Sequence, residues 1–257
     1  MFDTKLLAKL DSATKYPSIP TFHELGDRGI LQESGNPFAG YQGPIVATEK
    51  VDGTNARIII DSSSDWIIGS RDRLLTAAGD RVYDDSYGIV DKLRDLVPQL
   101  WIPGPSELFA YFFEVYGQRE SKNHRIYSDG KEHGARLFDV ATIPTKMFNM
   151  SVGDIAQWRD NDGQEFWPIH VHPWALDRVP RLATYANGDE LPDTVEGMQH
   201  LINQLAGKTQ VAINEGADDA RRAEGVVFRT AVHRHKIFKA RHESYTRTMT
   251  ERSKANA

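Results

Sequence analysis

The chain has 257 residues, no cysteine and a formal net charge of −5, and its apolar share of 40% and charged share of 26% are typical of a folded globular protein. The lack of cysteine excludes disulfides, thiol catalysis and thiolate metal sites. No apolar run approaches the roughly 20 residues that span a bilayer, and the first residues do not resemble a secretion signal. We therefore expect a cytoplasmic protein with no membrane and no disulfide partner.

In the first half of the chain, the pattern predicts a short helix, an irregular segment and then strands. The helix is expected over residues 3–13, and the prolines and glycines of residues 17–44 indicate irregular structure. Strands are expected at 45–48, 55–60, 65–70, 108–116 and 135–141. Because an Asp-Ser-Ser-Ser turn separates the second of these strands from the third, we expect them to form a hairpin.

The second half of the chain adds further helices and strands to this pattern. Helical spacing of apolar residues predicts helices over 86–97, 151–158 and 194–205, and strands are expected at 225–228 and 237–239. Strands and helices do not alternate steadily, which favours an α+β fold with largely antiparallel sheets over a doubly wound parallel sheet. We expect one domain over residues 1–241, including the irregular N-terminal segment, and a basic tail over 242–257.

The most informative stretch is Glu-Lys-Val-Asp-Gly-Thr-Asn at residues 49–55, between two predicted strands. A lysine at such a junction is a nucleophile only if its amine is neutral, which requires desolvation or nearby cations because free lysine titrates near about 10.4. Gly53 permits close approach of the backbone to a ligand. Taken alone, Lys-x-Asp-Gly is a weak pattern, and a solvated ion pair is the ordinary alternative.

Further short motifs follow this stretch in order along the chain. They are Ser-Arg at 70–71, Phe-Glu-Val-Tyr-Gly at 113–117, Leu-Phe-Asp-Val at 137–140, Glu-Gly-Val-Val at 224–227 and Phe-Lys-Ala-Arg at 238–241. Over about residues 45–241 the series resembles the covalent nucleotidyltransferase superfamily, most closely the phage-type RNA ligases that seal nicks. The resemblance implies an ATP-grasp-like nucleotidyltransferase domain of largely antiparallel sheets flanked by helices, with no OB-fold after it.

The resemblance also implies site residues. Lys50 would accept the nucleotide, with Lys239 and Glu224 as further catalytic groups, and Glu224 and Asn55 would hold Mg²⁺, which prefers oxygen ligands. The implied nucleotide contacts are Glu49, Asp52, Gly53, Asn55, Arg71, Glu114, Phe138, Lys239 and Arg241. Each of three residues also has a purely structural interpretation. These are a turn cap for Asn55, a buried ion pair for Glu114 and a core position for Phe138. Arg241 departs from the family, which usually has lysine there.

The activity implied by the resemblance is ATP-dependent ligation of RNA strand ends, with ATP and Mg²⁺ as cofactors and RNA repair as the setting. A 5′-phosphate would be joined to a 3′-hydroxyl through lysyl-AMP and an adenylylated 5′ end. The alternatives are an ATP-dependent DNA ligase, a GTP-using capping-type guanylyltransferase, and a non-catalytic nucleic-acid-binding module. Residues 229–254 carry eight Lys/Arg against two Glu, which indicates either a surface for the strand backbone or a solvated C-terminus.

Two histidine pairs invite a zinc interpretation. His170 and His172, and likewise His233 and His235, alternate as they would on one face of a strand. With no cysteine and no evident third or fourth ligand, we expect no zinc site.

Overall fold

The structure is a computed structural model that describes residues 6–78, 80–85, 88–117, 127, 133–216, 221–232 and 236–255. The chain forms two compact units. Unit 1 comprises Met1–Pro17, Gly53–Arg125 and Asp129–Arg178, and unit 2 comprises Ser18–Asp52, Ile126–Ser128 and Val179–Ala257. The chain therefore passes from unit 2 to unit 1 between Asp52 and Gly53, inside the stretch that carries the candidate nucleophile.

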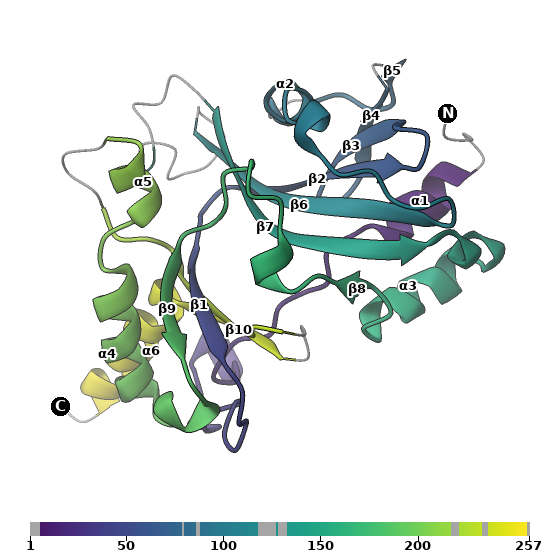
Figure 1. The fold of residues 1–257 in the computed structure, drawn as a ribbon. Coiled ribbons are helices and arrows are strands. Elements are labelled where there is room, and N and C mark those ends of the chain that lie inside the picture. The colour runs from purple at the N-terminus through teal and green to yellow at the C-terminus, as the bar shows by residue number, and fades with distance from the viewer. Residues whose placement is uncertain are drawn as a thin grey trace. The chain divides into compact units, whose positions relative to one another are not determined.

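Unit 1 is built on a seven-stranded antiparallel sheet of order β5-β4-β3-β2-β6-β7-β8 (Figure 1). The strands are β2 (Thr54–Asp61), β3 (Trp66–Ser70), β4 (Leu74–Ala77), β5 (Asp80–Arg81), β6 (Glu107–Gly117), β7 (His133–Pro144) and β8 (Glu165–Phe166). The hairpin expected from the Asp-Ser-Ser-Ser turn is confirmed, because β2 pairs with β3. The strands expected at 108–116 and 135–141 are β6 and β7, which are longer than the sequence pattern suggested.

Helices cover both faces of this sheet within unit 1 (Figure 1). They are α1 (Leu7–Ala13), α2 (Ile89–Arg94) and α3 (Val152–Asp160). Successive side chains of a strand point to opposite faces, so β2 contributes to two cores. Ile58 packs in a cluster with Leu93 of α2, whereas Ile59 packs in a cluster with Leu10 of α1 and Ile155 of α3. The near-continuous apolar pattern of β2 and β6 reflects this burial on both faces.

Unit 2 is built on a four-stranded antiparallel sheet of order β11-β10-β1-β9. Its elements are β1 (Ile45–Lys50), β9 (Arg181–Tyr185), β10 (Gly225–Thr230), β11 (Ile237–Arg241), α4 (Val195–Ala206), α5 (Gln210–Asn214) and α6 (His242–Ala255). Apolar residues of the sheet pack with α4, as Ala47 and Phe228 do with Met198 and Ile202. The outer strand β11 is bonded by the irregular N-terminal segment, since Phe22 N–H donates to the Lys239 carbonyl at 2.9 Å.

The expected α+β fold of largely antiparallel sheets with flanking helices is confirmed. The helix expected over 86–97 is shorter, because α2 ends at Arg94 and a 3₁₀ turn follows at Val97–Gln99. Residues 242–255, expected as a tail, form α6, which belongs to unit 2 and buries Tyr245 and Thr248. No helix in the described ranges is long and apolar enough to cross a bilayer.

The first histidine pair, His170 and His172, does not lie on a strand. Residues 169–171 form a 3₁₀ turn, Ile169–Val171, and His172 follows it. The His172 ring is buried, and its Nε2 lies 3.6 Å from Asp139 Oδ1. His233 and His235 lie outside the described residues. Within the described part of the chain, no group of three or more His, Asp or Glu could hold a metal ion.

Candidate active site

Lys50 and Glu224 meet at the end of the unit 2 sheet. The register places Lys50 opposite Gly225 and Gly225 opposite Arg241, so neighbouring strands bring these positions side by side. Glu224 directly precedes β10, and its carboxylate faces both cations. Lys50 Nζ lies 2.5 Å from Glu224 Oε2, and Arg241 Nε lies 2.7 Å from Oε1. The Lys50 side chain is 23% exposed, so a ligand can reach its amine.

Lys239 adds a further positive charge to the same face of this sheet. It stands two residues before Arg241 on β11, and alternate residues of a strand share a face. Gly225 allows the strands to approach, because a Cβ at this position would lie 2.1 Å from the Ala240 carbonyl oxygen. The face therefore carries three cations, of which Lys50 and Arg241 contact Glu224, and this excess of positive charge attracts an anionic phosphate.

Glu49 lies on the opposite face of β1 from Lys50, because the two residues are consecutive on the strand. Its side chain is buried, and its carboxylate accepts hydrogen bonds at the start of α5. The donors are the Thr209 hydroxyl, the Gln210 N–H at 2.7 Å and the Val211 N–H at 3.3 Å. Glu49 thus holds the segment before α5 against the strand that ends in Lys50. Its predicted contact with the cofactor stays a prediction.

The hydroxyl of Tyr127 holds the loop that follows Lys50. It accepts the backbone N–H of Asp52 at 2.7 Å, and the ring is buried. Burial raises the pKa of the Tyr127 phenol, so the hydroxyl remains protonated at neutral pH. Tyr127 was not predicted from the sequence, because it lies in no motif and in no periodic element. The one available signal is a lone aromatic residue in a long polar stretch, residues 117–134.

Three of the predicted nucleotide-binding residues meet on the sheet of unit 1. Asn55 lies opposite Glu114 on β6, and Glu114 Oε1 accepts the Gly53 N–H at 3.1 Å. Gly53 has no room for a side chain, because a Cβ there would lie 2.3 Å from the Val115 carbonyl oxygen. Asn55 Oδ1 is buried and has no hydrogen-bond partner within the described ranges. A buried amide oxygen without a partner is unusual, so this atom is a candidate for a contact with a ligand.

Phe138 lies among other aromatic rings on the face of the sheet that α1 and α3 cover. Its ring is 4.9 Å from that of Tyr16 at an interplanar angle of 86°, and 6.2 Å from that of Phe112. The side chain is only partly buried. The contact with Tyr16 agrees with a core position for part of the Phe138 ring. The stacking of a base on Phe138 stays a prediction.

Arg71 is exposed in the turn between β3 and β4, and a buried arginine holds that turn. Arg57 Nη1 donates to the carbonyls of Ser70, at 2.5 Å, and Arg71, at 3.1 Å. Arg57 is the second residue that the sequence analysis missed. The signal was present, because a charged residue inside the apolar run 56–60 must either face water or be paired.

The oxygen donors predicted for a metal have the right chemistry for Mg²⁺. Glu224 offers a carboxylate and Asn55 an amide oxygen, the ligand types that Mg²⁺ prefers. Glu224 belongs to unit 2 and Asn55 to unit 1. Both oxygens of Glu224 already face cations, so a metal that binds this carboxylate displaces one of those contacts.

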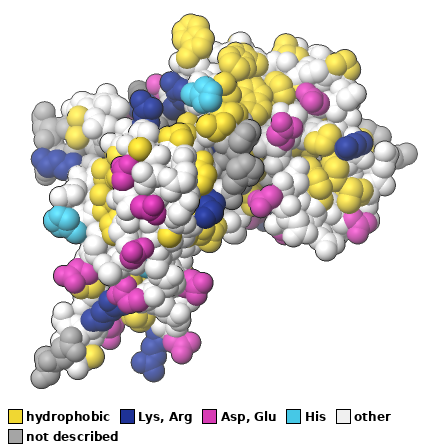
Figure 2. All heavy atoms as spheres, turned by 60° about the horizontal axis from the view of Figure 1, so that its bottom comes forward, with side chains coloured by type: hydrophobic (Ala, Val, Ile, Leu, Met, Phe, Trp, Pro, Cys, Tyr) yellow, Lys and Arg dark blue, Asp and Glu magenta, His cyan; other side chains and the backbone are white. Residues whose placement is uncertain are grey.

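The basic segment 229–254 does not form an unpaired positive stripe over the residues that the structure describes. Arg229 is buried, and most of the other cations have acidic partners within unit 2. The pairs are Arg241–Glu224, Arg247–Glu243, Arg252–Glu33 and Lys254–Glu251. On the face shown in Figure 2, Lys and Arg side chains are scattered and form no continuous patch. The formal charge of the segment therefore overstates its attraction for a polyanion.

Comparison with known proteins gives one family and one group of structures. A family model described as RNA ligase matches residues 43–241. Comparison with the curated proteins finds no match. Among solved structures, a variant of Naegleria gruberi RNA ligase with ATP and Mn is similar, with a TM-score of 0.52 and 16% identity, over 92% of this chain and 62% of that chain.

Two further Naegleria gruberi structures agree with this likeness. A second variant of the RNA ligase with AMP and Mn has a TM-score of 0.50 and 16% identity, over 90% of this chain and 63% of that chain. The same ligase with PPi has a TM-score of 0.50 and 15% identity, over 91% and 62%. The chain therefore spans less than two thirds of the length of these ligases, and the likeness is one of fold.

Proposed function

Because this chain belongs to the RNA ligase family, we propose that it is an ATP-dependent polynucleotide ligase that joins a 5′-phosphate to a 3′-hydroxyl on RNA. The observation that carries the proposal is the contact of 2.5 Å between Lys50 Nζ and Glu224 Oε2, with Arg241 on the other carboxylate oxygen. A partly exposed lysine with an adjacent proton acceptor, among further cations, is what nucleophilic attack on a phosphate requires.

Lys50 is the nucleophile. A lysine amine attacks phosphorus only in its neutral form, so any proton on it must leave before attack. Glu224 Oε2, at 2.5 Å from Lys50 Nζ, is within reach to accept that proton. Lys239 and Arg241 offset negative charge at the α-phosphate as the bond forms.

The reaction has three steps. Lys50 Nζ forms a bond to the α-phosphorus of ATP, the bond from that phosphorus to the bridging oxygen breaks, and pyrophosphate leaves with lysyl-AMP formed. The AMP is then transferred to the 5′-phosphate of a strand, which frees Lys50. Finally a 3′-hydroxyl attacks the activated phosphate, the phosphodiester forms and AMP leaves.

The residues of unit 1 bind the nucleotide. Glu114 accepts from a ribose hydroxyl, Phe138 stacks on the base, and Arg71 contacts a phosphate. Asn55 and Glu224 are the residues that would hold Mg²⁺, which would supply charge neutralisation at the phosphates. Support for a ligand near Asn55 comes from its buried oxygen, which has no partner within the described ranges.

The test is a covalent labelling experiment. The protein is incubated with Mg²⁺ and ATP labelled at the α-phosphate, denatured and analysed for retained label. We expect label on the wild type and on Lys208→Ala, which changes an exposed lysine of unit 2, and none on Lys50→Ala. GTP serves as the competing donor, and label from GTP but not ATP indicates a capping-type enzyme. A wild type that retains no label from either nucleotide contradicts the proposal.

A second experiment identifies the nucleic acid. The labelled protein is offered nicked duplexes with RNA or DNA on the 3′-hydroxyl side of the nick, together with single strands. We expect the strands to be joined when the end is RNA, and joining of DNA ends alone would make the protein a DNA ligase. Binding of the nick without any adduct would indicate a non-catalytic module.

A further inference from the structure

We propose that Arg57 is a positioning residue, which ties the turn that presents Arg71 to helix α1 and thereby sets the reach of Arg71 toward a phosphate. The proposal rests on the proposed function, since the contact of Arg71 with a phosphate belongs to it. Because Arg57 itself is fully buried in a sheet strand, it would act on a phosphate only through Arg71.

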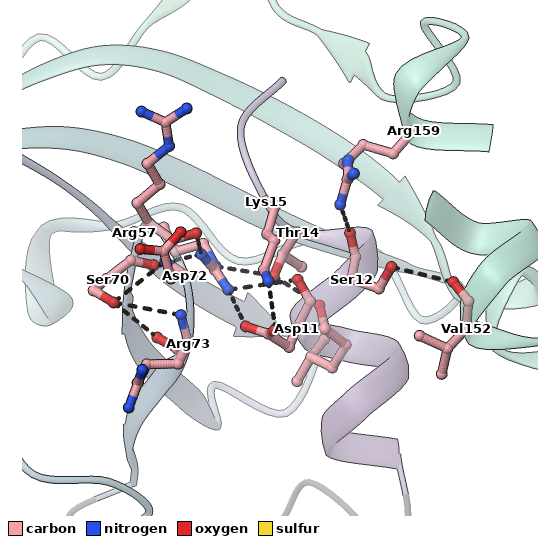
Figure 3. A network of polar contacts seen from close by, with 12 residues as sticks. Asp11, Ser12, Thr14, Lys15, Arg57, Ser70, Asp72, Arg73, Val152 and Arg159 are labelled. Carbon is pink, nitrogen blue, oxygen red and sulfur yellow. Dashed lines mark hydrogen bonds and ion pairs between the residues drawn. The ribbon is translucent and has the colours of Figure 1, made fainter. Parts of the chain in front are cut away.

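The guanidinium of Arg57 connects two parts of unit 1 that are distant in sequence (Figure 3). On one side, Nη1 donates to two consecutive carbonyls of the turn, those of Ser70 and Arg71. On the other side, Nη2 lies 2.6 Å from Asp11 Oδ1 and Nε lies 3.1 Å from Thr14 Oγ1. All three nitrogens are therefore engaged, and the side chain is fully buried.

A buried arginine is costly unless its partners satisfy it. Burial lowers the pKa of Arg57 to about 10, and the neighbouring carboxylate of Asp11 acts in the opposite direction, so the side chain stays charged at neutral pH. The planar fork of arginine can hold two carbonyls at once, which a lysine ammonium cannot do with the same rigidity. An arginine at position 57 is therefore better suited to holding the carbonyls of a turn than to packing in an apolar core.

The turn itself depends on this anchor. Arg57 lies opposite Gly69 in the β2–β3 register, and a Cβ at Gly69 would lie 3.4 Å from the guanidinium carbon and 3.0 Å from the Arg73 carbonyl oxygen. Within the turn, the hydroxyl of Ser70 is the main side-chain contact, with the N–H groups of Asp72 and Arg73 both at 3.4 Å. The Ser70 N–H closes the turn by donating to the Arg73 carbonyl at 2.9 Å. The two bonds from Arg57 Nη1 add to this closure, because they hold the carbonyls of Ser70 and Arg71 and connect the turn to α1.

The first test is a double-mutant cycle on strand joining, with Arg57→Lys, Arg71→Ala and the double variant. We expect Arg57→Lys to slow joining by about tenfold, since small misplacements of a reacting group are expensive. In the Arg71→Ala background the same change should alter the rate by less than about twofold, because the effect passes through Arg71. Equal losses in both backgrounds would show that Arg57 only stabilises the fold and would overturn the proposal.

The second test does not depend on catalysis. Trypsin cleaves after arginine, so cleavage after the exposed Arg71 reports how firmly the turn is held. We expect faster cleavage at this bond in Arg57→Lys, and no change in Arg159→Gln. Arg159 is the matched control, because it also bonds α1, at the Ser12 carbonyl at 2.8 Å, but does not touch the turn. Equal cleavage of the wild type and Arg57→Lys after Arg71 would overturn the proposal.

If Arg57→Lys does not fold, Thr14→Val takes its place, because it keeps the shape of the residue and removes the acceptor of Nε, together with the bond that the hydroxyl donates to the Leu10 carbonyl at 2.7 Å. We expect Thr14→Val to slow strand joining by about threefold, with little effect in the Arg71→Ala background, and to speed trypsin cleavage after Arg71. The two proposals fail separately. A wild type without a covalent adduct refutes the ligase, whereas the cleavage after Arg71 still decides whether Arg57 holds the turn.

Discussion

The carboxylate of Glu224 lies between two cations from neighbouring strands, with Lys50 Nζ at 2.5 Å from one oxygen and Arg241 Nε at 2.7 Å from the other. The β1–β10–β11 register produces this arrangement, because Lys50, Gly225 and Arg241 are directly opposite one another. The positions of the proposed nucleophile and of the proposed proton acceptor therefore follow from the pairing of the strands.

Glu224→Gln tests that carboxylate. Glutamine keeps the shape but carries no charge to accept a proton or pair with two cations, so the rate of lysyl-AMP formation should fall by about 100-fold or more. Single-turnover labelling with ATP measures it. Glu196→Gln, an exposed position on α4, is the control and should react at the wild-type rate. Unchanged labelling of Glu224→Gln would remove Glu224 from the proposed mechanism.

Substitutions at Arg241 test whether the arginine at this position can be replaced by the lysine that is usual in the family. Arg241→Lys preserves a cation beside Glu224, so labelling should stay within about threefold of the wild type. Arg241→Ala leaves one carboxylate oxygen without its cation, and we expect a loss of about tenfold or more. The readout is the rate of adduct formation at saturating ATP. Equal rates for the lysine and alanine variants would show that charge at this position is not used.

Tyr127→Phe removes only the hydroxyl that accepts the Asp52 N–H. The change leaves the Asp52 N–H without its acceptor, at an expected cost of about 1–3 kcal/mol in the free energy of unfolding. Labelling of Lys50 should also slow, because the loop after the nucleophile is less firmly held. Urea unfolding and single-turnover labelling measure the two effects. Tyr185→Phe is the matched control in unit 2, since that hydroxyl has no hydrogen bond to another described residue, and it should change neither quantity.

The fold class and the motif residues could be predicted from sequence because both depend on local pattern. Alternation and turn chemistry identified the β2–β3 hairpin, and short motifs identified Lys50 and Glu224. Periodicity alone does not show that these two residues meet, because 174 positions separate them in the chain. The pairing was expected only through the resemblance of the ordered motifs to a known family.

The features that the sequence analysis missed depend on long-range partners. Arg57 is explained by Asp11 and by the turn at Ser70, and none of these belongs to the same local pattern. Helix α6 was missed because it buries few residues, among them Tyr245 and Thr248, so its apolar face gives a weak signal. The direction of the Glu49 carboxylate follows from strand alternation, but its acceptance of bonds at the start of α5 does not.

Glu49→Gln separates a structural from a nucleotide-binding role. The carboxylate is 2% exposed and accepts bonds from Thr209, Gln210 and Val211. Replacing one oxygen by an amide leaves one of these donors unsatisfied, and we expect a loss of about 1–3 kcal/mol in the free energy of unfolding. Urea unfolding measures this loss. The ATP concentration for half-maximal labelling should stay within about twofold, and a larger rise would show that the side chain also serves the cofactor.

His242 makes the stability of the protein depend on pH. Burial lowers its pKa from 6.5 to about 4, with the charge of Arg222 acting in the same direction, and its Nε2 lies 3.2 Å from the Ala206 carbonyl oxygen. Between these two pKa values the unfolded chain takes up a proton that the folded chain does not. Stability is therefore full above pH 6.5 and falls as the pH drops toward 4.

We expect the urea midpoint to fall between pH 7 and pH 5 in the wild type, and to fall less in His242→Gln, which cannot titrate. The comparison is made on the difference between the two pH values within each variant, because glutamine also changes packing at this buried position. His200→Gln, which alters an exposed histidine of α4, is the control and should retain the full wild-type dependence on pH. An equal fall in the wild type and in His242→Gln would assign the pH dependence to other groups.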